Sequence, residues 1–305
     1  MKVPYRKPPL STEQQADLLI SRGLIIHDRN ELIDFLSRVS YYRLTAYLFP
    51  FKKTGSEHYE VGTTFETIYR RYTFDRRFRL LILDALERFE TAMKARIVNV
   101  FVMRHGALGY LDIHNYNDFS PDKFDRFLNE IREAVKKSSE KFVKHFLDKY
   151  SDQDLPLWMA SELITFGTMF TMFRNMNYQE QKEIAETFQL PVKILKSWLH
   201  TLNYIRNICA HHARLWNKRL GVAPQMPKRK GFEAWTAFDT EKPFFILLML
   251  SHLLKCCAPH THWRTRMEEL IDEYGELPFE KIGFSPGWKE NSIWKNDFVK
   301  LPDDD

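Results

Sequence analysis

The chain contains few cysteines. Only three occur in 305 residues, at Cys209, Cys256 and Cys257, and two of them are adjacent. Thiols so arranged give no disulfide framework, so the class of small disulfide-stabilised secreted proteins is excluded. The N-terminal residues also show no signal peptide. We therefore expect a protein of the reducing cytoplasm.

The sequence also lacks an apolar run long enough to cross a membrane. The longest run, PFFILLMLSHLLKCCA at residues 243–258, contains His252 and Lys255. A membrane-spanning helix needs roughly 20 consecutive, predominantly apolar residues. This run therefore predicts a core helix, and we expect no membrane as a partner.

Neither sign of charge is in large excess. Lysine and arginine number 45 against 40 acidic residues, which gives a formal charge of +5. This balance permits an anionic partner without requiring one. A hydrophobic content of 44% and an aromatic content of 14% exclude a disordered chain. The length allows one large domain or two modest ones.

Several common catalytic motifs are missing. The sequence contains no P-loop, no glycine-rich dinucleotide fingerprint, no H-E-x-x-H zinc motif and no nucleophilic Ser or Cys elbow. The sequence therefore lacks the usual signatures of nucleotide-dependent enzymes, zinc proteases and serine or cysteine hydrolases. We expect no cofactor.

Helical periodicity runs through most of the chain. Between residues 65 and 105 the apolar positions that recur at helical spacing are Phe74, Phe78, Leu81, Ala85, Phe89 and Met93. Further helices are predicted within 11–23 and 29–50, and near 121–150, 155–175, 179–187, 191–216, 243–257 and 263–274. There is no strand ladder, internal repeat or low-complexity tract. The sequence therefore predicts an all-α fold.

A loop at residues 52–64, KKTGSEHYEVGTT, separates the first helices from the long one. Its glycines favour turns, and Gly62 marks a plausible domain boundary. We predict an N-terminal helical module over residues 1–62, a larger helical bundle over 63–275 and a C-terminal tail over 276–305.

The stretch IRNICAHHARLWN, residues 205–217, combines polar and apolar side chains in one predicted helix. In a helix that turns about 100° per residue, one face is apolar, and we expect it to pack into the core. This face contains Trp198, Leu202, Ile205, Cys209, Ala213 and Trp216. The opposite face is polar and contains His200, Asn203, Asn207, His211 and Arg214. Arg206 flanks the apolar face, and its side chain is long enough to curl outward.

This polar face has two interpretations. A solvated helix face usually carries Lys and Glu, whereas this one carries His, Asn and Arg. Those side chains can hold a phosphodiester and move protons near neutral pH. They can equally form a structural hydrogen-bond network, and the residues alone leave both interpretations open.

A metal site is a further alternative. Two histidine and cysteine clusters occur, Cys209, His211 and His212 in the first, and Cys256, Cys257, His260 and His262 in the second. On a helix, Cys209 lies on the core face and His211 on the other, so they cannot share one ion. The second cluster lacks the paired C-x-x-C spacing of structural zinc sites. We therefore expect no metal.

The segment RNICAHH matches the R-x-x-x-x-H signature of HEPN-domain ribonucleases. Arg206 and His211 are its ends, and Asn207 occupies the position that is frequently polar. Four blocks of the chain, in this order, are similar to the Abi-like proteins, which are bacterial abortive-infection proteins of the AbiD/AbiF type. The blocks are residues 41–51, 75–97, 154–170 and 202–217.

The resemblance implies an all-α HEPN-type helical bundle with an N-terminal helical extension. It implies a metal-independent endoribonuclease that acts in phage defence or as a toxin. It also implies a homodimer in which two motifs form one composite site, and a small non-coding RNA that restrains the protein. Another HEPN subgroup carries an adenylylated Tyr two residues after the His, but Ala213 stands there in this chain.

RNA carries its own nucleophile, the 2′-hydroxyl, so cleavage does not require a metal. We assign proton transfer to His211 and binding of the phosphate oxygens to Arg206, with Asn207 orienting either group. The products would be a 2′,3′-cyclic phosphate and a 5′-hydroxyl. Arg206 and His211 lie about 140° apart on an ideal helix. One chain therefore cannot easily place both side chains on the same phosphate. In a two-fold dimer the second chain would supply the other side chain from across the interface.

Basic residues elsewhere are candidates for RNA contact. The predicted set is Arg70, Arg71, Arg76, Arg77, Arg79, Arg214, Lys228, Arg229 and Lys230. A basic run is also the ordinary composition of a solvated helix face. On the long helix, Glu87 or Glu90 is placed to pair with Arg206. The alternative to an enzyme is an inert RNA-binding or scaffolding HEPN protein, in which Arg206 and His211 tie the dimer together.

Overall fold

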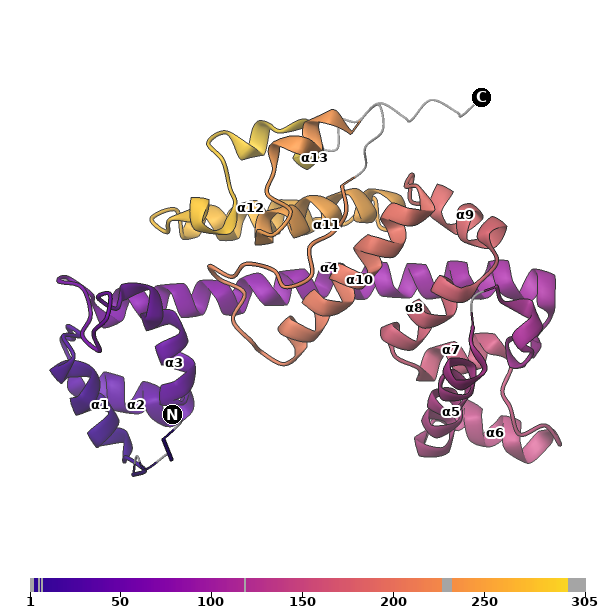
Figure 1. The fold of residues 1–305 in the computed structure, drawn as a ribbon, viewed down its shortest axis with the longest axis horizontal. Helices are drawn as coiled ribbons and strands as arrows, with labels where there is room; N and C mark the ends of the chain where they lie inside the picture. The colour runs from indigo at the N-terminus through magenta and orange to yellow at the C-terminus, as the bar shows by residue number, and fades with distance from the viewer. Residues whose placement is uncertain (1–2, 5, 7, 118, 227–231, 296–305) are drawn as a thin grey trace. The chain divides into compact units, whose positions relative to one another are not determined.

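The computed structural model describes residues 3–4, 6, 8–117, 119–226 and 232–295 (Figure 1). In this part of the chain the backbone forms α-helices and short 3-10 helices. The β contacts found there are two single bridges, between Ile25 and Thr64 and between Lys52 and Tyr59. The predicted all-α fold is confirmed.

Three short helices precede a long one, and nine more follow it in the described residues. The first four are α1 (Thr12–Ser21), α2 (Arg29–Arg38), α3 (Tyr41–Leu48) and α4 (Phe65–His105). The others are α5 (Pro121–Lys137), α6 (Lys141–Lys149), α7 (Leu157–Leu163), α8 (Phe166–Asn175), α9 (Tyr178–Glu186), α10 (Val192–Ala210), α11 (Pro243–Cys257), α12 (Trp263–Glu273) and α13 (Ser292–Lys295). The 3-10 helices are η1 to η6, at 49–51, 109–111, 113–115, 233–237, 279–282 and 288–290.

Several predicted helices are divided or shortened in the structure. The predicted range 155–175 breaks before Thr165, whose hydroxyl accepts a hydrogen bond from the Thr168 N–H at 3.2 Å and so caps α8. The ranges 29–50 and 121–150 are also divided, between α2 and α3 and between α5 and α6, without a side-chain cap on α3 or α6. Apolar spacing continues across each break, so periodicity alone does not reveal it.

The chain divides into two compact units. The first comprises residues 1–79 and 269–278, and the second comprises 80–268 and 279–305. These limits differ from the predicted boundaries at 62 and 275. They differ because α4 begins in the first unit and continues into the second, which leaves the Gly62 loop inside the first unit.

The first unit has an aromatic core and a buried ion pair. The rings of Phe35 and Phe65 meet edge to face with centroids 5.4 Å apart. The Tyr47 hydroxyl donates to the Asp75 carboxylate at 2.6 Å, and the guanidinium of Arg79 pairs with the same carboxylate. Removing one partner of such a buried pair typically costs about 3–5 kcal/mol, because the other charge is left uncompensated.

The second unit is built around α11, in which every residue from Pro243 to Leu254 is buried. A helix that is apolar on all sides belongs in a core, as the sequence predicted. Across the described residues, no helix combines the length and the apolar character needed to span a membrane. The indole N–H of Trp198 on α10 donates to the Gln225 carbonyl at 3.0 Å and fixes α10 in this core.

Candidate active site

Helix α10 ends at Ala210, one residue before His211. The His212 N–H donates to the Cys209 carbonyl at 3.1 Å, and the Ala213 N–H donates to the Ile208 carbonyl at 2.9 Å. His212 has a φ of 56°, in the left-handed region. These bonds form a Schellman motif, which terminates a helix.

The predicted continuation of this helix to residue 216 is therefore wrong. Ala213, which was expected on the core face, is exposed. The earlier members of that face, Trp198, Leu202, Ile205 and Cys209, are buried as predicted. The sequence has no Gly or Pro at residues 211–213 to mark the end of the helix, and the left-handed position is held by a histidine.

Arg206 pairs with Glu90 across the two helices that meet here. Its Nε lies 3.7 Å from the Glu90 Oε1, and the side chains are 38% and 17% exposed. That oxygen has no hydrogen-bond partner among the described residues. Burial raises the pKa of Glu90, while the charges of Arg206 and Lys94 oppose this shift. The prediction that Glu87 or Glu90 pairs with Arg206 is confirmed for Glu90.

Lys94, one turn after Glu90 on α4, anchors the site to α7. Its Nζ donates to the carbonyls of Ser161 at 3.0 Å and Ile164 at 2.8 Å. Both carbonyls belong to the end of α7, where a cation stabilises the unpaired acceptors. Burial lowers the pKa of Lys94, against the opposing charges of Glu162 and Glu90. Sequence reasoning missed this contact.

These side chains line a groove between α4 and α10, which cross in Figure 1. Its volume is about 320 Å³. The charged residues on its wall are Glu87, Glu90, Lys94 and Arg206. The groove therefore presents both cations and carboxylates to whatever enters it.

The two other predicted catalytic residues lie at the end of α10. Asn207 is exposed, and its Oδ1 accepts from Nη1 of Arg206 at 3.5 Å. His211 is also exposed, and its imidazole makes no hydrogen bond within the described residues. It is not part of the groove wall. The structure thus brings Arg206, Asn207 and Glu90 together and leaves His211 presented outward.

The predicted basic surface on α4 is largely occupied by contacts within the first unit. Arg70 pairs with Glu276 at 2.5 Å, and Arg77 pairs with Glu273. The guanidinium of Arg71 lies 4.4 Å from the centre of the Phe51 ring. An arginine that is already paired in this way gains less binding free energy from contact with a phosphate.

Arg79 is the clearest departure from the predicted RNA-contact set. Its side chain is 5% exposed and pairs with Asp75. A guanidinium in that position cannot reach a surface polynucleotide, so the predicted contact of Arg79 does not fit its place in the core. Arg76 is exposed, and Arg214 is half-buried. Lys228, Arg229 and Lys230 lie outside the described residues.

The structure separates two residues of the first predicted metal cluster. Cys209 is buried in the core, while His211 is exposed at the end of the helix. Within the described ranges, no three His, Cys, Asp or Glu side chains are close enough to hold one metal ion. Burial raises the pKa of Cys257 to about 11, so this thiol favours its neutral form.

Comparison with known proteins identifies a family. A family model described as Abi-like protein matches residues 34–217, which is more than half of the chain. The matched region includes α4, α7 and α10 and ends just after the Arg206 to His211 segment. No curated protein and no solved structure matches the chain significantly.

Proposed function

Because the chain belongs to the family of Abi-like proteins, we propose that it is a metal-independent HEPN endoribonuclease that cleaves RNA at the Arg206/His211 site. Membership in this family points to abortive infection, a form of defence against phage. The side chains at the end of α10 support the ribonuclease part of this proposal.

The position of Arg206 is the observation that carries the proposal. Glu90 approaches its Nε and Asn207 approaches its Nη1, while Nη2 donates no hydrogen bond within the described part of the chain. A guanidinium held from one side, with donors left over, can bind two oxygens of a phosphodiester. Charge building on the phosphorane would strengthen the same contacts in the transition state.

His211 supports the proton transfers that cleavage requires. Its imidazole is exposed at the first residue beyond the helix, where it can approach the 2′-hydroxyl or the 5′-oxygen of a bound strand. Attack by the 2′-oxygen on phosphorus would expel the 5′-oxygen, which takes up a proton. The products are a 2′,3′-cyclic phosphate and a 5′-hydroxyl.

The proposal includes a homodimer with a composite site. Arg206 faces the groove, whereas His211 lies outside its wall, so one chain presents the two groups separately. A two-fold axis near the end of α10 would bring the Arg206 of one chain to the His211 of the other. We include in the proposal a small non-coding RNA that occupies and restrains this surface.

The test is cleavage of RNA by the purified protein in excess EDTA. We expect cleavage to persist, and its 3′ fragments to accept label from a polynucleotide kinase without phosphatase treatment, because their ends carry a 5′-hydroxyl. His211→Ala and Arg206→Ala are expected to lower cleavage at least a hundredfold, roughly the contribution of general acid–base catalysis.

The matched control is His212→Gly, which removes the adjacent histidine and suits the left-handed backbone. It is expected to cleave at the wild-type rate. Loss of cleavage on chelation would overturn the metal-independent mechanism. Protein that binds RNA and never cleaves it would favour the inert scaffold instead.

A further inference from the structure

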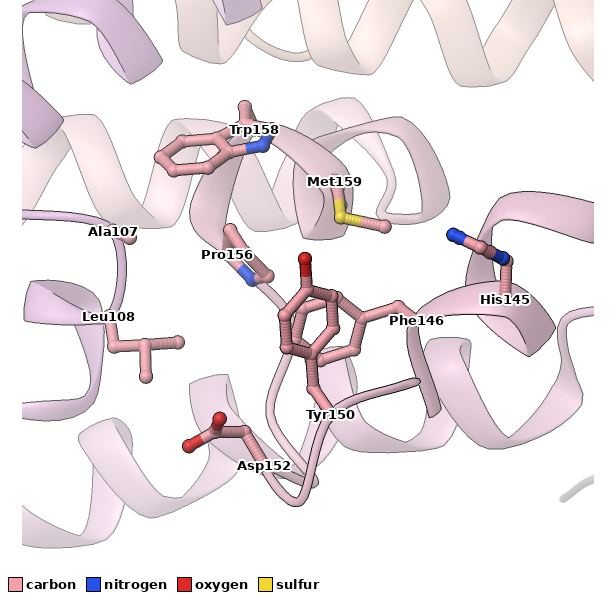
Figure 2. Close-up of a pocket in the computed structure, with 9 residues that line it drawn as sticks. All are labelled: Ala107, Leu108, His145, Phe146, Tyr150, Asp152, Pro156, Trp158 and Met159. Carbon is pink, nitrogen blue, oxygen red and sulfur yellow. The ribbon is translucent and has the colours of Figure 1, made fainter. Parts of the chain in front are cut away.

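A second hollow in the same unit lies outside the groove described above. It has a volume of about 490 Å³ and is enclosed by the loop after α4, by α6 and by the start of α7. In Figure 2 Leu108 lies on one side of its lining and His145 on the other, with Pro156 and Tyr150 between them and Trp158 and Asp152 at opposite ends. Its size suits a single planar ligand rather than a folded partner.

The wall of this hollow is aromatic and accessible. Trp158 is 49% exposed and Tyr150 is 47% exposed, so both rings are open to a ligand. The Tyr150 ring rests on Phe146 with centroids 4.8 Å apart, so its orientation is fixed from behind. Exposed rings held in place offer flat surfaces on which another ring can stack.

Polar groups with unused hydrogen-bonding capacity accompany these rings. Asp152 lines the hollow with an exposed carboxylate that makes no hydrogen bond or ion pair in the described part of the chain. The indole N–H of Trp158 and the hydroxyl of Tyr150 also make none there. An aromatic pocket with a few polar groups in its wall is the usual form of a small-ligand site.

The charges of α6 narrow the class of ligand. Lys149 is exposed at the end of this helix, with its Nζ 5.3 Å from the centre of the Tyr150 ring. Lys141 and Lys144 are further exposed cations of the same helix, against one exposed carboxylate, Asp148. These cations disfavour a cationic ligand, which aromatic rings and a carboxylate would otherwise suit. They favour a ligand that carries a phosphate beside its ring. A proline-rich peptide would leave both the carboxylate and the lysines without a partner.

The carboxylate selects among the nucleobases. Guanine presents N1–H and the N2 amino group side by side, and a carboxylate can accept both hydrogen bonds at once. The other bases do not offer two adjacent donors on that edge. A guanine bound beside Tyr150 would satisfy Asp152, with Lys149 available to its phosphate and Trp158 available to stack on the strand at the other end of the hollow.

Helix α7 connects this hollow to the groove that contains Arg206. Trp158 lies in its first turn, and Ser161 and Ile164 at its other end accept hydrogen bonds from Lys94 of the groove. Trp158 and Ile164 are six residues apart, or about 9 Å along a helix at 1.5 Å per residue. A few nucleotides can span that distance.

We propose that the hollow formed by Trp158, Tyr150 and Asp152 binds one unpaired guanine of an RNA strand whose backbone continues toward the Arg206 groove. This inference rests on the proposed RNA substrate. It adds a base-reading subsite to that function. Stacking supplies affinity for any base, and Asp152 supplies the preference for guanine.

The test measures binding to full-length protein carrying His211→Ala, so that no probe is cleaved. The probes are a labelled hexauridylate and the same oligomer with one central guanosine, followed by fluorescence anisotropy. We expect the guanosine oligomer to bind about tenfold more tightly. Trp158→Ala should weaken binding of both oligomers about tenfold or more, in line with the loss of one stacked base.

Asp152→Asn should remove the preference for guanosine while leaving the hexauridylate affinity unchanged or improved. The matched control is Asp148→Asn, which makes the same charge change at an exposed aspartate of α6 that does not line the hollow, and it should keep the preference. Equal affinity for the two oligomers, or a preference that survives in Asp152→Asn, would overturn the proposal.

Binding of GMP alone shows whether the ligand is an RNA strand or a free nucleotide. Weaker binding of GMP than of the oligomer supports the strand, whereas equal affinity would overturn it in favour of a nucleotide ligand. The outcome is independent of the ribonuclease assay. A protein that binds guanosine and cleaves nothing would refute only the proposed function, and one that cleaves without base preference would refute only this inference.

Discussion

At the scale of single residues, the second unit carries several ionisable groups away from water. Glu90 and Lys94 each lie close to a group of opposite charge, and each has a pKa moved by burial toward its neutral form. Arg206 is the more exposed member of this cluster. A cluster whose charges are only partly compensated can rearrange its ion pairs when an anion arrives, which suits a binding groove better than a static core network.

His252 gives a residue-scale prediction about acid stability. It is buried, its Nε2 lies 2.8 Å from the Phe188 carbonyl, and burial lowers its pKa to about 4 from the ordinary 6.5. The unfolded chain therefore takes up a proton between about pH 6.5 and pH 4 while the folded chain does not, so stability falls as pH decreases. The loss expected from this group is about 3 kcal/mol.

Urea unfolding near pH 7 and near pH 4 measures this effect. His252→Gln cannot titrate, and its amide can still donate to the Phe188 carbonyl. The variant should lose less stability than the wild type across this interval. If both proteins lose the same amount, another group causes the acid sensitivity.

At the residue scale one contact could be predicted from the sequence and another could not. The pairing of Arg206 with an acidic residue of α4 followed from two helices expected to pack together, and the structure confirms it for Glu90. The burial of Arg79 was not predictable from its position in a basic run. Its partners Asp75 and Tyr47 come from a helical turn and from a separate helix, and only the folded unit brings them together.

At the scale of elements, the spacing and length of the apolar segments predicted where the helices lie better than where they end. The bounds of α11 agree with the predicted range 243–257, because Pro243 starts the helix and the apolar run ends at Cys257. The end of α10 was missed, since His212 adopts a conformation that usually requires Gly. The breaks before α3, α6 and α8 were missed because they hardly disturb the apolar spacing.

The end of α10 gives a prediction about stability. His212 has φ of 56°, which a residue with a side chain adopts at a cost of roughly 1 kcal/mol or more. His212→Gly should therefore keep or raise the free energy of unfolding, whereas His212→Val should lower it by about 1–2 kcal/mol. Thermal unfolding of the two variants tests this difference. A valine variant as stable as the glycine variant would show that the left-handed turn is not maintained.

At the scale of the whole molecule, the proposed dimer makes a complementation experiment decisive. Arg206→Ala and His211→Ala each remove one half of the proposed site. A heterodimer of the two variants still holds one intact Arg206 and one intact His211, on opposite chains. We expect such mixtures to recover part of the cleavage that both homodimers lack.

The control is a mixture of two Arg206→Ala chains carrying different tags, which should stay inactive. Native mass spectrometry establishes that the heterodimer has formed. An inactive heterodimer would show that both groups act within one chain, and the cross-chain arrangement would then be wrong.

The division into two units could not be predicted from the sequence. A loop with glycines is the usual sign of a boundary, and Gly62 lies in one. The first unit instead recruits residues 269–278 from near the other end of the chain. Tyr274 from that segment packs on Phe74 with ring centroids 5.5 Å apart, a contact between positions that no local pattern links.

This discontinuous unit has a consequence for the timing of synthesis. About 190 residues separate its two segments along the chain, since the first ends at 79 and the second begins at 269. A ribosome adding about 5–20 residues per second needs roughly 10–40 s to make them. Until then Arg70 lacks Glu276 and Phe74 lacks Tyr274. The N-terminal helices therefore stay incomplete until most of the chain has been made, and a nascent or truncated product that ends before residue 269 lacks the second segment of the first unit.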